Sequence, residues 1–294
     1  RGVDVMFGSP GVHNVELYRC IEEAGSAHVL ARHEQGAGFM ADGYARASGK
    51  PGVAYVITGP GLCNIMTPMG QAYSDSVPVL VISSCLDETA AKKGQLHQML
   101  DQEAAAATVC DWSHTALDEA AAYALIDRAW VEFANDRPRP KHMQVPIAVL
   151  GGEAATPPPP PAAAPQRAAP DMAPIARMLN TAQRPVFVFG GGALHASKAA
   201  RGVLAACGAA SFSTYAARGL VPSDTPGHFG AYLARPSSAE VFRQADLVVA
   251  VGDEALSKLT PGKSVAVSDI TIVPTAEFSM NPDWQLNGAE QAER

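Results

Sequence analysis

Short apolar runs alternate with longer stretches of helical spacing in the first half of the chain. Continuous apolar strands that alternate with helices are typical of a parallel sheet covered on both faces. The pattern predicts strands at 3–7, 27–31, 53–58, 77–83 and 143–150, and helices at 15–24, 35–47, 62–74 and 117–135.

The second half repeats this rhythm. Strands are expected at 186–190, 209–214, 247–252 and 264–267, and helices at 196–207 and 238–244. We therefore expect an α/β protein with two open, mostly parallel, doubly wound sheets. After about Val267 the periodicity fades, and the pattern assigns no element to the tail.

A stretch rich in proline and alanine divides the two halves at 154–170, and residues 157–161 are five consecutive prolines. Such a tract cannot continue a helix or donate to a central sheet, and it behaves as a semi-rigid spacer. A long surface loop within one domain is the alternative. The expected division is a first domain at 1–152, a linker at 153–172, a central domain at 173–270 and an unassigned tail at 271–294.

Composition narrows the class of protein. A length of 294 residues predicts about two domains. The net charge of −7 has the wrong sign for gathering phosphate backbones, so nucleic acid is not an expected partner. No apolar stretch reaches 18 residues, and the five cysteines form no CxxC pair, so we expect a cytoplasmic protein without membrane contact. Because the chain starts with Arg1 rather than Met, we expect a piece of a longer protein.

In an open parallel sheet, the ligand crevice lies beyond the carboxyl ends of the strands. Two glycine-containing loops follow predicted strands at 8–11 and 58–61, and each suits either a ligand cradle or a tight turn. The triple glycine at 190–192 lacks the third spaced glycine of a dinucleotide fingerprint.

Glu34 also follows a predicted strand, and it opens a helix rich in small residues that suit a tight helix pair or a subunit interface. A carboxylate at a helix N-terminus is favoured by the helix dipole alone. The functional alternative is a carboxylate at an apolar sheet edge that shares a proton with a ligand nitrogen. The residues by themselves leave both alternatives open.

The histidines have no metal-ligand spacing, so His13, His33, His97 and His114 are expected to cap or pack, and the sequence predicts no metal site. A polar stretch that contains Gln98 follows the fourth strand and suits a substrate loop or a solvated turn.

Several motifs together resemble the pyrimidine-binding domain of thiamine-diphosphate enzymes. The resemblance is greatest to the acetolactate synthase and 2-oxoacid decarboxylase branch, and to the 5-guanidino-2-oxopentanoate decarboxylase type within it. The second half resembles the central domain of the same enzymes. The motifs are FGSPG at 7–11, RHEQGAGFMADGYAR at 32–46, GKPGV at 49–53, TGPG at 58–61 with Asn64, DSVPVL at 75–80, RPVFVFGGG at 184–192, GLVP at 219–222 and ADLVVAVG at 245–252.

This resemblance implies a role for Glu34. In the family, this glutamate hydrogen-bonds N1′ of the aminopyrimidine and promotes the imino tautomer that deprotonates C2 of the thiazolium. The resulting ylid attacks a 2-oxoacid, which loses CO₂ to leave an enamine. The cofactor lies between two subunits, which implies a homodimer or homotetramer. The implied cofactor-binding residues are Pro10, Gly11, Glu34, Thr58, Gly59, Pro60, Gly61 and Asn64, and the implied substrate residues are His13 and Gln98.

The chain also departs from the family. Nothing after Gly252 matches the Gly-Asp-Gly and Asn segment that binds Mg²⁺ and the diphosphate, so we expect that metal from an absent third domain and no turnover by this chain alone. The alternatives are a non-catalytic remnant that keeps the fold and a dimer face, and a carboligase similar to acetohydroxyacid synthase with FAD in its central domain. The carboxylates of Glu88, Asp101 and Glu103 would suit a substrate with a guanidino group. An ordinary role as acidic surface residues is a sufficient alternative.

Overall fold

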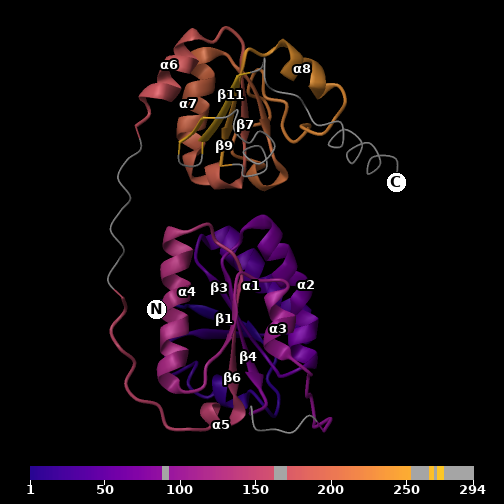
Figure 1. Ribbon diagram of the computed structural model, residues 1–294, viewed down its shortest axis with the longest axis vertical. Helices are drawn as coiled ribbons and strands as arrows, with labels where there is room; N and C mark the ends of the chain where they lie inside the picture. The colour runs from indigo at the N-terminus through magenta and orange to yellow at the C-terminus, as the bar shows by residue number, and fades with distance from the viewer. Residues whose placement is uncertain (88–92, 162–170, 253–264, 268–269, 275–294) are drawn as a thin grey trace. The chain divides into compact units, whose positions relative to one another are not determined.

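The structure, a computed structural model, describes residues 1–87, 93–161, 171–252, 265–267 and 270–274 of the chain (Figure 1). The chain divides into two compact units, residues 1–166 and 167–294. The predicted acid at Glu88 lies outside the described residues. Residues 153–161 are exposed and form no helix or strand, whereas residues 162–170 of the predicted linker also lie outside the described part.

The first unit is built on a six-stranded sheet in which every neighbouring pair is parallel, in the order β2-β1-β3-β4-β6-β5. The alternation of apolar strands with helices therefore predicted the correct kind of sheet. The strands are β1 (Val5–Gly8), β2 (Ala27–Leu30), β3 (Gly52–Val56), β4 (Val79–Cys85), β5 (Ser113–Thr115) and β6 (Lys141–Pro146).

Helices cover both faces of this sheet. Figure 1 shows α1, α2 and α3 on one side and α4 on the other, and each side has its own apolar cluster. One cluster includes Ala41 and Leu62, and the other includes Met143 and Ala129. The helices are α1 (Glu34–Ser48), α2 (Pro60–Asp75), α3 (Gln102–Ala107), α4 (Glu119–Asn135) and the short α5 (Ile147–Leu150).

The small residues of α1 pack it tightly against α2. A Cβ atom at Gly38 would overlap the ring of Pro68 and would meet Ile65 at 2.7 Å. Glycine is therefore required at this close approach between the helices. The packing fixes the first turns of α1, where Glu34 lies, against α2.

The second unit contains a five-stranded sheet in the order β10-β11-β9-β7-β8. The three strands β9, β7 and β8 are parallel, whereas β11 and β10 extend the sheet in antiparallel fashion. Helices α6 and α7 contribute to one apolar cluster on the sheet and α8 to another. The elements are α6 (Ala173–Thr181), β7 (Pro185–Phe189), α7 (Ser197–Cys207), β8 (Ala210–Ser213), α8 (Ser238–Gln244), β9 (Leu247–Val251), β10 (Val265–Val267) and β11 (Ile270–Pro274).

Two predicted elements were wrong in detail. The helix expected at 15–24 is only a 3-10 turn over Val15–Tyr18, because most of this segment is exposed and Ile21 is its one buried residue. The strand expected at 143–150 ends at Pro146, and α5 follows it. Proline lacks the amide donor that a continuing central strand needs.

Candidate active site

The carboxyl ends of the parallel strands in the first unit bring the predicted loops to one edge of the sheet. Glu34 is the first residue of α1, just beyond β2, and its side chain is half-buried. His33 caps the helix through its Nδ1 atom, which accepts a hydrogen bond from the Gln35 amide at 3.1 Å. His33 therefore has the capping role that the sequence predicted for it.

Asn64 and Gly61 of α2 surround the Glu34 carboxylate. The Asn64 Nδ2 atom donates to Glu34 Oε2 at 2.9 Å. A Cβ atom at Gly61 would lie 3.5 Å from Glu34 Oε1, so the glycine keeps the space beside this second oxygen clear of a side chain. The predicted residues Glu34, Gly61 and Asn64 thus form one cluster, with one carboxylate oxygen oriented by an amide.

Gly59 makes the turn that joins β3 to α2. Its φ of +63° lies in the left-handed region, and a Cβ atom here would overlap the carbonyl oxygen of His97. Pro60 then starts the helix, where its missing amide donor costs nothing. Beside it, Thr58 is buried, and its amide donates to Ser84 Oγ at 3.0 Å.

The loop after β1 lies against the same residues. The Gly11 amide donates to Asn14 Oδ1 at 2.7 Å, which closes the loop on itself, and Pro10 is exposed. A Cβ atom at Gly11 would overlap the Ile57 side chain, and one at Gly61 would lie 2.7 Å from the same side chain. Ile57 therefore joins the loop that contains Gly11 to the cluster around Glu34.

Gln102 is a residue of this site that the sequence did not identify. Its Oε1 atom accepts the Gly59 amide at 2.8 Å, and its Nε2 atom lies within 3.1 Å of Ser83 Oγ, the Ser84 carbonyl and Gln144 Oε1. The side chain is buried at the start of α3. The Asp101 N-cap could have revealed α3, but six residues are too few for a periodic signal.

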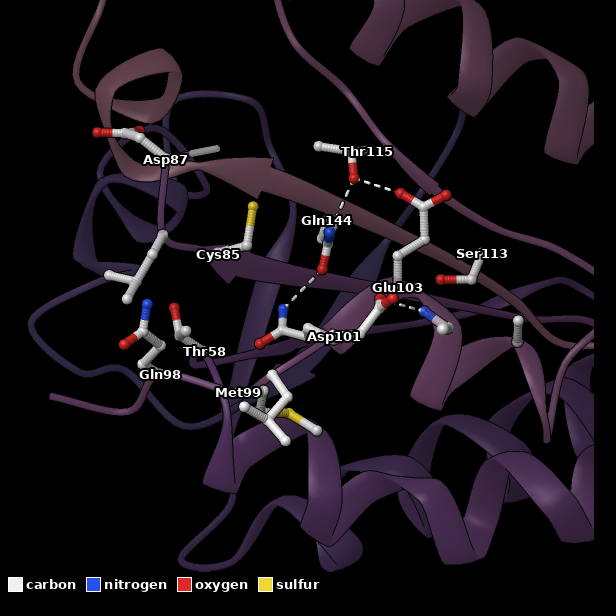
Figure 2. Close-up of a pocket in the computed structure, with 15 residues that line it drawn as sticks. Thr58, Cys85, Asp87, Gln98, Met99, Asp101, Glu103, Ser113, Thr115 and Gln144 are labelled. Atoms are coloured by element: carbon white, nitrogen blue, oxygen red, sulfur yellow. Dashed lines mark hydrogen bonds between the residues drawn. The ribbon is translucent and has the colours of Figure 1, made fainter. Parts of the chain in front are cut away.

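A cleft of about 450 Å³ opens beside Gln102. Figure 2 shows Thr115 between Gln144 and Glu103, with a hydrogen bond to each. Three carboxylates line the cleft: Asp87 and Asp101, which are exposed, and Glu103, whose side chain is 39% exposed. The lining also includes Thr58, which places the cleft next to the turn at Gly59.

The predicted substrate residues lie near this edge. Gln98 lines the cleft, but its Oε1 atom accepts the amides of Gly94 and Gln95 at 2.8 and 3.1 Å. His13 follows Gly11, and its ring contacts His97 with 5.4 Å between the ring centroids. Burial lowers the pKa of His13, and the nearby charge of a protonated His97 lowers it further.

The glycines at 190–192 of the second unit follow β7 and bond to the end of β9. The Gly190 amide donates to the Val251 carbonyl at 2.8 Å, and the Gly192 amide donates to the Gly252 carbonyl at 3.2 Å. These two hydrogen bonds give the glycine run a structural role within the unit.

No group of three or more His, Cys, Asp or Glu side chains in the described part of the chain is arranged to hold a metal ion. Among the helices that the structure describes, none is long and apolar enough to cross a membrane.

Comparison with known families decides which protein family this arrangement represents. Residues 1–105 match the N-terminal TPP-binding domain of thiamine pyrophosphate enzymes, and residues 172–274 match their central domain. The chain belongs to the thiamine pyrophosphate enzyme family. The resemblance found in the sequence motifs is thereby confirmed for both halves.

Relatives in this family include decarboxylases and synthases. The chain is 46% identical over 259 residues to a probable 2-ketoarginine decarboxylase from Pseudomonas aeruginosa, which covers 86% of this chain and 46% of the relative. It is 30% identical over 215 residues to the mitochondrial acetolactate synthase catalytic subunit of Saccharomyces cerevisiae. This match covers 68% of this chain and 31% of the relative. It is 31% identical over 198 residues to the acetolactate synthase large subunit of Lactococcus lactis. This match covers 65% of this chain and 34% of the relative. The chain thus spans less than half the length of these curated relatives.

The residues of the first unit fit the aminopyrimidine part of the thiamine pyrophosphate that names this family. Glu34 offers a half-buried carboxylate that Asn64 orients, with the space beside Oε1 clear of a side chain at Gly61. A carboxylate in this position can hold a proton against a ring nitrogen. The turn at Gly59, just before Pro60 and Gly61, presents backbone atoms and no side chain.

Proposed function

We propose that this chain contributes the cofactor-activating part of a thiamine-diphosphate-dependent 2-oxoacid decarboxylase. The hydrogen bond from Asn64 Nδ2 to Glu34 Oε2, at 2.9 Å, is the observation that carries the proposal. It fixes the carboxylate rotamer that a proton transfer to a ring nitrogen requires. Glu34, Pro10, Gly11, Thr58, Gly59, Pro60, Gly61 and Asn64 are the proposed cofactor-binding residues of this chain.

When bound, thiamine diphosphate supplies a nucleophilic carbon and then accepts the electron pair that CO₂ leaves behind. In our proposal, Glu34 holds the proton at Oε1 or Oε2 that the pyrimidine nitrogen shares. Asn64 prevents the carboxylate from turning away, and Gln102 holds the Gly59 turn in place through the Gly59 amide. The protein's contribution is therefore orientation and proton placement.

A cationic side chain is the proposed feature of the substrate. The Pseudomonas relative is described as a 2-ketoarginine decarboxylase, and 2-ketoarginine carries a guanidinium group. Asp87, Asp101 and Glu103 give the cleft three carboxylates, which are the natural partners of a guanidinium. Gln98 and His13 are proposed to contact the same substrate.

A carboligase is the second candidate function. The similarity of 30–31% to acetolactate synthases from yeast and Lactococcus favours it. Such an enzyme would join the activated carbon to a second 2-oxoacid instead of releasing an aldehyde. FAD in the central domain belongs to this second candidate only.

The remaining parts of the active enzyme are also proposed from the family. Mg²⁺ and the diphosphate group would be held by groups other than the cofactor-binding residues proposed above. We infer that this chain alone does not turn over substrate. A second copy of the protein would complete the cofactor site. Leu30, at the end of β2, and Phe39, in α1, are exposed apolar side chains that support a partner for this unit.

The decisive experiment supplies a panel of 2-oxoacids to the full-length protein that contains this chain, with thiamine diphosphate and Mg²⁺. We expect CO₂ and the aldehyde of 2-ketoarginine from the wild-type protein, and a loss of at least about 100-fold in Glu34→Gln. Acyloin products from pyruvate would favour the carboligase. No product from any 2-oxoacid would favour a non-catalytic protein that keeps the fold.

The substrate proposal has its own variant. Glu103→Gln removes one charge from the cleft but keeps an oxygen that can accept from Thr115. We expect the KM for 2-ketoarginine to rise about tenfold, equivalent to about 1.4 kcal/mol, with little change for pyruvate. Glu119→Gln, at the start of α4 and outside the lining of the cleft, is the matched control and should change neither KM. Equal changes for both substrates in Glu103→Gln would contradict a role in recognising the cation.

A further inference from the structure

Two histidine rings meet at the sheet edge that carries Glu34. The centroids of His13 and His97 lie 5.4 Å apart, and the ring planes cross at 63° in an edge-to-face contact. Within the part of the chain that the structure describes, the buried Nδ1 atom of each ring has no hydrogen-bond partner. Buried polar atoms in proteins normally have one. Two rings in contact, each with such a nitrogen, therefore indicate a site for a proton or a ligand.

Both rings are attached to the loops that surround Glu34. His13 lies two residues after Gly11, whose loop packs on Ile57, and Ile57 in turn packs against Gly61 beside Glu34 Oε1. The carbonyl oxygen of His97 packs directly against Gly59. The two imidazoles thus belong to the same group of loops as the carboxylate.

Hydrogen bonds order the loops next to both rings. Asn14 is buried and bonds to both Gly11 and Ser9, so the loop that carries His13 is closed on itself. His97 has a φ of +63°, which is uncommon for a residue with a side chain, and the loop next to it is tied by Gln98. Backbone in sparsely populated regions persists where the surrounding structure enforces it, which is frequent at functional sites.

We propose that His13 and His97 form a coupled acid–base pair that delivers the proton needed to turn the 2-oxoacid into its aldehyde. This inference rests on the decarboxylase function proposed above. Because a positive charge on one ring opposes a second charge on the other, binding of a first proton to the pair disfavours binding of a second. One ring can then donate while the other remains neutral.

The overall reaction consumes one proton: R–CO–COO⁻ + H⁺ gives R–CHO + CO₂. The bond between the carboxylate carbon and the carbonyl carbon breaks, and its electron pair stays with the carbonyl carbon. That pair then forms the new C–H bond with the proton donated by the imidazolium. A proton from water restores the charged ring. A carboligase has no need of this C–H bond, so the pair is specific to aldehyde formation.

The first test needs no cofactor. In the 294-residue chain, we expect NMR titration to show that His97→Asn raises the pKa of His13, since the opposing charge is removed. Asparagine tolerates the left-handed backbone at position 97, so the loop should keep its conformation. His195→Asn, an exposed histidine of the second unit, is the control and should leave His13 unchanged. An unchanged pKa of His13 in His97→Asn would overturn the coupling.

The second test separates CO₂ from aldehyde in single turnovers of the full-length, cofactor-loaded protein. In His97→Asn, and in His13→Asn at saturating substrate, we expect aldehyde formation to slow about 100-fold more than CO₂ release. His195→Asn should change neither rate. Aldehyde formation at the wild-type rate in both pair variants would overturn the proposal. No CO₂ from the wild-type protein would instead overturn the decarboxylase function, and the NMR titration would still decide whether the rings are coupled.

Discussion

Single residues at the site show how strongly local geometry limits substitution. The backbone of Gly59 is in the left-handed region, and the carbonyl oxygen of His97 lies where the Cβ atom of a larger residue would be. Gly43, in the middle of α1, has no atom within 4 Å of the same position and is exposed. We therefore expect substitution by alanine to have opposite effects on stability at these two positions.

We expect Gly59→Ala to destabilise the first unit by about 2 kcal/mol or more, because the new methyl group adds both strain and overlap. Gly43→Ala should stabilise it by about 0.5–1 kcal/mol, because alanine loses less backbone entropy in a helix. Urea unfolding of both variants measures the difference. A Gly59→Ala protein as stable as wild type would show that the turn is not held as described.

The sequence predicted some residues of the site and missed others. The motifs placed Glu34, Gly61 and Asn64 in the site, and the structure brings them together. Gln102 was missed because its importance comes from partners on β4, β6 and the Gly59 turn, which no local pattern reveals. The contact between His13 and His97 joins loops 84 residues apart in the chain and was hidden for the same reason.

Among the elements, three neighbouring strands are joined by one buried histidine. His142 of β6 lies between Ser83 of β4, 2.8 Å from Nε2, and Ser113 of β5, 2.7 Å from Nδ1. Its burial lowers the pKa of His142 to about 3. Both ring nitrogens have hydroxyl partners, so the neutral ring is satisfied inside the sheet.

This histidine makes stability depend on pH in a defined window. Unfolded histidine takes up a proton below its ordinary pKa of about 6.5, whereas the folded protein does so only near pH 3. The unfolded state therefore binds more protons as the pH falls through this range, and the folded state loses about 1.4 kcal/mol per pH unit. Above pH 6.5 the full contribution is present.

We expect the free energy of unfolding of the wild-type chain to fall between pH 6.5 and pH 5 by about 1.4 kcal/mol per pH unit more than that of His142→Gln. Other histidines contribute equally to both proteins and cancel in the comparison. Urea titrations at several pH values provide the measurement. Parallel pH profiles for the two proteins would mean that His142 is not kept neutral by burial.

The elements that were hard to predict are the short ones. Strand β5 has three residues and α3 has six, and both are too short to produce a periodic pattern. Strand β11 lies in the stretch where the apolar period fades, and its pairing with β9 is a contact that the pattern does not encode. The long helices α1, α2 and α4 were predicted to within two residues at each end.

On the scale of the whole molecule, the two units have separate apolar clusters. The clusters of the first unit contain no residue beyond Leu150, and those of the second unit none before Ile175, among the described core residues. The run of prolines at 157–161 lies between them. We therefore expect residues 1–161, expressed alone, to fold.

Urea unfolding and circular dichroism of this piece test the expectation. Its midpoint should match that of the corresponding transition in the full chain, because folding units with their own cores unfold independently. The separate piece 171–294 serves as the comparison for the other transition. A midpoint for residues 1–161 that falls far below its value in the full chain would show that the units depend on each other.

Hydrogen–deuterium exchange at C2 of bound thiamine diphosphate measures whether Glu34 activates the cofactor. We predict that Glu34→Gln in the full-length protein slows this exchange by at least about 100-fold, because the neutral amide cannot share the proton. The control is Glu22→Gln, an exposed glutamate in the turns after Tyr18. It should exchange at the wild-type rate. Exchange in Glu34→Gln at the wild-type rate would show that Glu34 does not activate the cofactor.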